Sequence, residues 1–172
     1  RQGGQPAIEE AMAAIRNSGT SSADRQQLVE ILGEIRRSEF IPVLLELIKS
    51  EKDGALVAAA LSSLQAYSDA RIGEQITDQF GKLPENARLA AETLLTSRPT
   101  WAADLLAAVE KQQLDSASLS DGVPRRILLH NNSDLSARVQ QIWGDVGVAN
   151  AEKVQKELQR LNAILAEGSG NP

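Results

Sequence analysis

The chain has 172 residues, with 18 lysines and arginines against 23 aspartates and glutamates and no cysteine, so its formal net charge is −5. The hydrophobic share of 42% excludes wholesale disorder, and the lack of cysteine excludes disulfide scaffolds, zinc knuckles and thiol nucleophiles. Only 3% of the residues are aromatic, so the core must be built from Leu, Ile, Val and Ala, which favours helices over a β-sandwich.

Hydrophobic residues recur at helical spacing through most of the chain. Ile8, Ala11, Met12 and Ile15 follow the i, i+3, i+4, i+7 rule and predict a helix over 5–17. The same rule predicts further helices over 22–36, 38–50, 54–66 and 84–96, and apolar residues at other helical spacings predict helices over 69–81 and 99–112. No stretch combines two-residue alternation with hairpin turns, so we expect no sheet.

Helix-capping residues stand at the expected boundaries. Ser21 or Ser22 can cap the second helix and Asp69 the fifth, because their short side chains accept hydrogen bonds from unpaired N–H groups. Pro84 and Pro99 predict the start of a helix, because the first turn of a helix tolerates a residue without a backbone N–H.

The first six predicted helices form three consecutive hairpins. Leu32, Leu61 and Leu94 hold similar places in the second helix of each, at spacings of 29 and 33 residues. A repeat of about 30–45 residues with two helices per unit is typical of an α-solenoid. We therefore predict an all-α fold, an α-solenoid of antiparallel helix pairs over 1–148.

The C-terminal third is less regular. A polar insertion over 114–122 follows the helix 99–112, a short helix begins at Pro124, and a further helix covers 134–144 with Ser133 as its cap. The segment 150–166 reads as a longer helix with one apolar stripe, formed by Val154, Leu158, Leu161 and Leu165. We expect a C-terminal helix within 149–167 that packs on the last repeat, and a linker over 168–172 that leads to a downstream domain.

The residues that could carry chemistry are few. His130 is the only histidine, and we interpret it as a surface residue at a helix C-terminus. Glu30 and Glu34 share a helix face, where such pairs are usually solvated. The loop between Asp115 and Asp121 lacks the ligand spacing of a calcium loop. We therefore predict no cofactor, no metal and no catalytic residue in this segment, which is not an enzyme by itself.

Two further groups of side chains are candidate binding residues. Trp101 and Trp143 lie in register with apolar stripes, which favours core packing over a binding role. In a solenoid the polar faces of the second helices line a common surface, and we hypothesise that this surface docks another protein. Its candidate residues are Glu30, Glu34, Arg88, Glu92, Arg138 and Gln141. The alternative is that they are only solvated.

Over roughly 5–145 the helix pairs resemble HEAT or armadillo-type repeats, whose second helices carry runs like Leu61-Ser62-Ser63-Leu64 and Leu32-Gly33-Glu34-Ile35. The stretch Ile127–Val139, followed by Trp143-Gly144 and a final Gly-Asn-Pro, resembles the region before the haem domain of planctomycete-type membrane-bound dehydrogenases. That resemblance implies a scaffold between redox modules in a periplasmic or cell-surface protein. No haem is implied for this segment, which has no cysteine.

We accordingly expect a non-catalytic scaffold whose partners are proteins, within a larger oxidoreductase. The alternatives are a free-standing peptide-binding solenoid and a HEAT-like enzyme acting on nucleic acid or binding a bilin. The acidic charge argues against nucleic acid, and no apolar run approaches the roughly 18 residues that span a bilayer, so we expect no direct membrane insertion. A downstream Cys-x-x-Cys-His would favour the redox scaffold.

Overall fold

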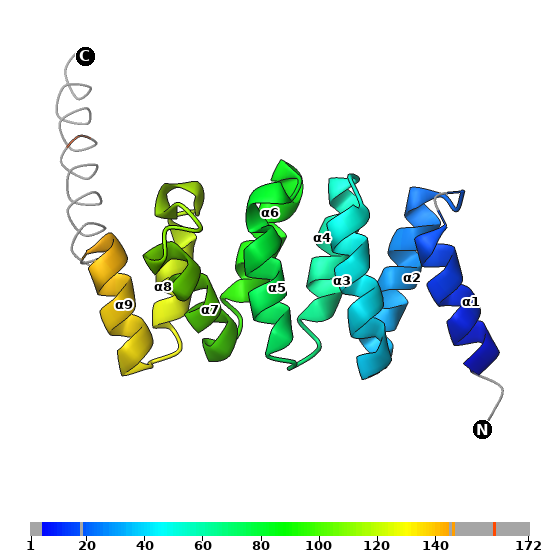
Figure 1. The fold of residues 1–172 in the computed structure, drawn as a ribbon, viewed down its shortest axis with the longest axis horizontal. Helices are drawn as coiled ribbons and strands as arrows, with labels where there is room; N and C mark the ends of the chain where they lie inside the picture. Colours follow the sequence, from blue (N-terminus) through cyan, green and yellow to red (C-terminus); the bar gives the residue numbers. More distant parts are fainter. Residues whose placement is uncertain (1–4, 18, 145, 147–159, 161–172) are drawn as a thin grey trace, which may run out of the picture.

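The computed structural model describes residues 5–17, 19–144, 146 and 160, and all regular structure in these residues is helical. The all-α prediction is confirmed for this part of the chain. Its nine α-helices are α1 (Gln5–Arg16), α2 (Ser22–Ile35), α3 (Ile41–Ser50), α4 (Gly54–Leu64), α5 (Arg71–Gln79), α6 (Glu85–Leu95), α7 (Pro99–Glu110), α8 (Gly122–Leu128) and α9 (Ser133–Trp143) (Figure 1). Short 3₁₀ turns occupy Ser38–Phe40, Phe80–Lys82 and Ser116–Ser118.

The helix caps largely follow the sequence. The Ser21 hydroxyl accepts a hydrogen bond from the Asp24 N–H at 3.2 Å, and Asp69 accepts one from the Arg71 N–H at 3.0 Å. For the helix predicted over 134–144, the predicted capping residue was wrong by one position. Asn132 caps α9 in place of Ser133, because its Oδ1 accepts from the Leu135 N–H at 3.1 Å.

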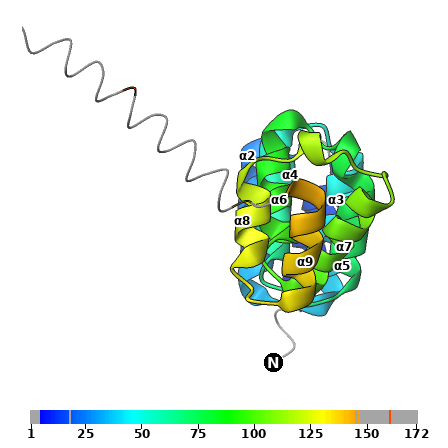
Figure 2. The same ribbon diagram turned by 90° about the vertical axis from the view of Figure 1, so that its left-hand side faces the viewer.

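The helices form two layers between which the chain alternates. In the first layer α1 contacts α3, α3 contacts α5, α5 contacts α7, and α7 contacts α9. In the second layer α2 contacts α4 and α4 contacts α6, and α8 lies beyond α6. Figure 1 shows the row from α1 to α9, and Figure 2 looks along it, with α2, α4, α6 and α8 on one side.

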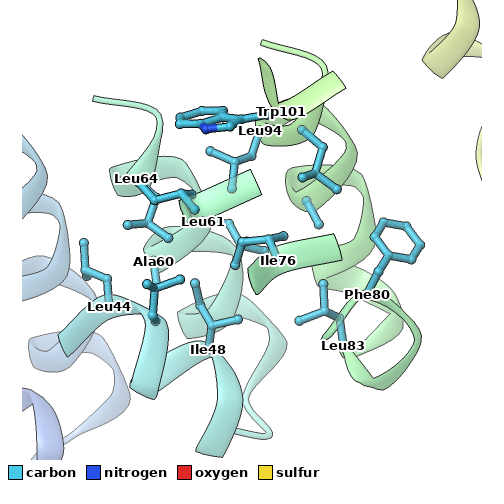
Figure 3. Close-up of a cluster of buried hydrophobic side chains, with 14 of the residues drawn as sticks. Leu44, Ile48, Ala60, Leu61, Leu64, Ile76, Phe80, Leu83, Leu94 and Trp101 are labelled. Atoms are coloured by element: carbon cyan, nitrogen blue, oxygen red, sulfur yellow. The ribbon is translucent and has the colours of Figure 1, made fainter. Parts of the chain in front are cut away.

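One continuous hydrophobic core fills the space between the layers (Figure 3). It contains mainly aliphatic side chains, as the composition predicts, among them Leu44, Leu61, Leu64, Ile76 and Leu94, all fully buried. Trp101 is fully buried as well, which confirms its core packing, and its Nε1–H donates to the Asp69 carbonyl at 3.1 Å. Trp143 is only partly buried.

Two glycines allow neighbouring helices within a layer to approach closely. A Cβ on Gly33 of α2 would lie 2.9 Å from Ser63 Cβ of α4. A Cβ on Gly73 of α5 would lie 2.6 Å from Trp101 Cδ1 of α7. Both distances are shorter than carbon atoms tolerate, so the α2–α4 and α5–α7 contacts require glycine at these positions.

Three side chains connect successive second-layer helices in the same way. Each lies two or three residues past the end of its helix and hydrogen-bonds to a backbone carbonyl near the end of the preceding one. The donors are Tyr67, Arg98 and His130. The acceptors lie 35, 33 and 34 residues earlier, at distances of 3.0, 3.1 and 2.9 Å, on Leu32, Gln65 and Thr96.

The predicted helix 150–166 and the linker 168–172 lie outside the described residues, apart from Arg160. That residue is helical and exposed.

Candidate groove between α2 and α4

The six predicted interaction residues do not lie on one surface. Glu30 and Glu34 are exposed on α2, and Arg88 is partly buried on α6, in the same layer. Arg138 and Gln141 lie on α9, which belongs to the first layer because it contacts α7. Whether any of the six meets a partner stays a prediction.

Glu92, the remaining member of the set, is an internal residue. It is 4% exposed, and its carboxylate accepts hydrogen bonds from the Ser120 N–H at 2.9 Å and from the Ser120 hydroxyl. Arg126 of α8 pairs with the same carboxylate at 3.2 Å and donates to the Thr96 hydroxyl at 3.0 Å. Glu92 therefore holds the 111–121 loop and α8 against α6.

Arg138 also has an internal role. Its guanidinium pairs with Glu110 of α7 at 2.7 Å and donates to the Ala103 carbonyl at 3.2 Å. The hydrogen bond from Arg138 lowers the pKa of the Glu110 carboxyl below its ordinary value. These contacts fasten α9 to α7.

A groove of about 480 Å³ lies between α2 and α4 on the candidate surface. One wall is a polar row of α2, formed by Gln26, Glu30 and Glu34 at four-residue intervals. The opposite wall consists of small side chains from α4 and from the turn that follows it, namely Ala55, Ala58, Ala59, Ser62 and Ala66. Gly33 and Ser63 line the groove where the two helices approach.

The polar wall of this groove is acidic. The Gln26 amide donates to Glu30 at 3.2 Å, and within the described residues no ion pair neutralises the carboxylate of Glu30 or Glu34. Arg36 lines one end of the groove, in the left-handed conformation that ends α2. The opposite wall is largely apolar, and its side chains are short. The groove thus combines a row of negatively charged side chains with a surface that the backbone of a partner helix can approach closely.

A second, smaller hollow of about 220 Å³ lies between α5 and α7. Glu74, Asp78, Asp104 and Lys111 are among its lining residues. Burial raises the pKa of the Asp104 carboxyl, and the nearby charge of Glu74 raises it further.

Among the described residues, no group of three or more histidines, aspartates or glutamates is arranged to hold a metal ion. None of the helices within the described ranges has the length and apolar character that crossing a bilayer requires. The prediction that His130 lies on the surface was wrong. Its side chain is partly buried, and its Nε2 hydrogen-bonds to the Thr96 carbonyl.

Sequence reasoning singled out Glu30 and Glu34 but missed the wall of α4 that faces them. The signal was present, because small residues recur at Ala55, Ala59 and Ser62, on a different side of α4 from Leu61.

Comparisons of the chain with protein families, curated proteins and solved structures found no match.

Proposed function

We propose that this segment is a non-catalytic helical-repeat scaffold, an α-solenoid of HEAT-like pairs that binds another protein. Two features of the described residues support the proposal. The chain alternates between two layers, and second-layer helices are joined by hydrogen bonds that recur at separations of 33 to 35 residues. In such an array each unit packs on its neighbours and leaves an extended side surface for binding.

In this proposal the binding surface is the α2–α4 groove. The observation that supports it is the row of acidic side chains on α2 beside the short side chains of α4. The chemistry of the groove fits an amphipathic helix of a partner protein. Its small apolar residues would lie on α4, and lysines or arginines along one edge would face Glu30 and Glu34.

A synthetic helical peptide tests the proposal directly. The probe has leucines and alanines on one face and lysines at four-residue intervals along its edge, and its affinity is measured by fluorescence anisotropy at 50 and 300 mM salt. We expect binding that weakens with salt and falls at least tenfold in the variant Glu30→Lys/Glu34→Lys, because the reversed charges repel the lysines.

The matched control is Glu46→Lys/Asp134→Lys, which makes the same charge change on exposed positions of the first layer. It should bind the peptide within twofold of the original chain. Failure of the original chain to bind, or equal binding by both double variants, would contradict the groove assignment.

A place between redox modules of a larger dehydrogenase is a prediction that rests on the sequence resemblance alone. The coding sequence after Pro172 tests it. A Cys-x-x-Cys-His motif there would support the redox scaffold, and a stop codon would favour a free-standing binding solenoid.

A further inference from the structure

The hydrophobic stripe of α2 is less covered than the stripe of α4. Both follow the same i, i+3, i+4, i+7 spacing, and the four members on α4 are all fully buried, namely Val57, Ala60, Leu61 and Leu64. On α2 only Leu32 is buried to the same degree. Ile31 is 41% exposed, Ile35 is 44% exposed and Leu28 is partly buried.

The missing cover is on the side of α2 that faces away from α4. Within the described residues α4 lies between α2 and α6, whereas α2 is the first helix of the second layer and stands with α1 at the end of the row (Figure 1). Gly33 marks the side of α2 that contacts α4. In a regular α-helix Leu28, Ile31 and Ile35 lie about 140–160° around the axis from Gly33. These three side chains therefore form an apolar end face, where a further second-layer helix could pack.

This end face is complementary to itself when two copies of α2 run in opposite directions. Reversal places Leu28 of one copy beside Ile35 of the other and brings the two Ile31 side chains together midway between them. Each apolar side chain thus meets an apolar side chain of the second copy, which is the condition for a contact of twofold symmetry.

The charges along α2 favour the same orientation. Asp24 is exposed in the first turn of α2, one turn before Leu28 and on the same side of the helix. Arg36 and Arg37 directly follow the last residue of α2, and the Arg37 side chain is 41% exposed in its surface ion pair with Glu39. Antiparallel pairing places the acidic start of each helix beside the basic end of the other, whereas parallel pairing would place like charges together.

We propose that two copies of this chain associate through the end face of α2, with the two α2 helices antiparallel about a twofold axis. The contact joins two rows end to end. It leaves the α2–α4 groove of each copy open, because that groove lies on the other side of α2. One helix face is a small interface, so the dimer forms and dissociates with protein concentration.

Analytical ultracentrifugation of the full chain measures this association. We expect the average mass to rise with concentration toward twice the 18.5 kDa of one chain. The variant Ile31→Glu/Ile35→Glu should raise the dissociation constant at least tenfold, because each copy then brings two carboxylates into the apolar contact.

The matched control is Leu89→Glu/Leu129→Glu, which makes the same charge change at two exposed leucines outside the end face, 64% and 77% exposed. Its dissociation constant should stay within twofold of the original value, and circular dichroism should show that both variants keep their helices. A single-chain mass at every concentration from low micromolar to submillimolar, or equal effects of the two variants, would overturn the proposal.

Single cysteines test the orientation, because the chain has no cysteine of its own. Under mild oxidation Ile31→Cys should link two chains by a disulfide. Asp24→Cys should remain reduced, since antiparallel pairing separates the two copies of residue 24 by about 22 Å along the helix axis. The control Leu89→Cys should also remain reduced. Linkage through residue 24 or residue 89 as readily as through residue 31 would contradict the antiparallel contact.

Discussion

At the scale of single residues, one guanidinium connects three parts of the N-terminal region. Arg25 of α2 donates from Nε to the Ile15 carbonyl at 2.8 Å and pairs through Nη1 with Glu51 at 2.7 Å. Both side chains are largely buried, at 11% and 19% exposed. The contacts hold the end of α1 and the turn between α3 and α4 against α2.

Replacing Arg25 by alanine should lower the free energy of unfolding by about 2 kcal/mol, because the Ile15 carbonyl and the Glu51 carboxylate lose their partner. Urea denaturation of both proteins measures the difference. Arg71→Ala is the matched control, since Arg71 also pairs with an acid, Asp69 at 2.6 Å, but its side chain is 77% exposed. It should change stability little. Equal losses in the two variants would contradict the role given to Arg25.

Asp104 predicts a second effect, which depends on pH. Because burial raises its pKa above the ordinary 3.8, the folded state holds its proton more tightly than the unfolded state does. Its contribution to stability therefore falls as pH rises from the unfolded-state pKa through the folded-state pKa. Above that window the ionised carboxylate destabilises the fold.

Asp104→Asn should consequently melt at a higher temperature than the original chain at pH 7, and the difference should shrink toward pH 3. At pH 3 the carboxyl is largely protonated in both states. Thermal melts at pH 3, 5 and 7 measure it. A variant that melts lower at pH 7, or a difference that does not change with pH, would show that the carboxylate is not destabilised by burial.

At this scale sequence reasoning recovered local interactions and missed distant ones. Ser21 was recognised as a cap because its partner is three residues away. The roles of Glu92 and Arg138 were not recognised, because Ser120 and Glu110 are each 28 residues away and nothing in a helical pattern indicates such contacts.

At the scale of helices, the hydrophobic spacing predicted where each helix lies but not how the C-terminal ones are arranged. The predicted surface makes the helix 134–144 the second member of a pair, and therefore groups Arg138 and Gln141 with residues of α2 and α6. The short α8 occupies the second-layer position in its place, which puts α9 in the first layer. A helix of 7 residues carries too little periodic signal to show this in advance.

The contact between α5 and α7 predicts the effect of adding a single methyl group. Gly73→Ala should lower the free energy of unfolding by about 1–3 kcal/mol, because its Cβ would collide with the buried Trp101. The loss should outweigh the better helix propensity of alanine. Chemical denaturation monitored by tryptophan fluorescence measures it.

The control for this variant is Gly81→Ala, where a Cβ would meet no atom within 4 Å. It should leave the stability unchanged or slightly raised. If Gly73→Ala were as stable as this control, the helices would not be as close as described.

At the scale of the whole molecule, we propose that one unit is repeated along a row. The hydrogen bonds of Tyr67, Arg98 and His130 support this because three different side chains make the same connection. A backbone that repeats, as proposed, would keep the position of this hydrogen bond while the residue type varies.

Distances between spin labels along the second layer test whether the helices are stacked in a row. Labels would be attached to cysteines introduced at exposed positions, in the pairs Glu30→Cys/Leu89→Cys and Glu30→Cys/Arg125→Cys, which link α2 to α6 and α2 to α8. Neighbouring helices pack 8–10 Å apart, so pulsed electron paramagnetic resonance should give about 20 Å for the first pair and about 30 Å for the second. A second distance no longer than the first would mean that the helices close into a bundle, and would contradict the stacked row.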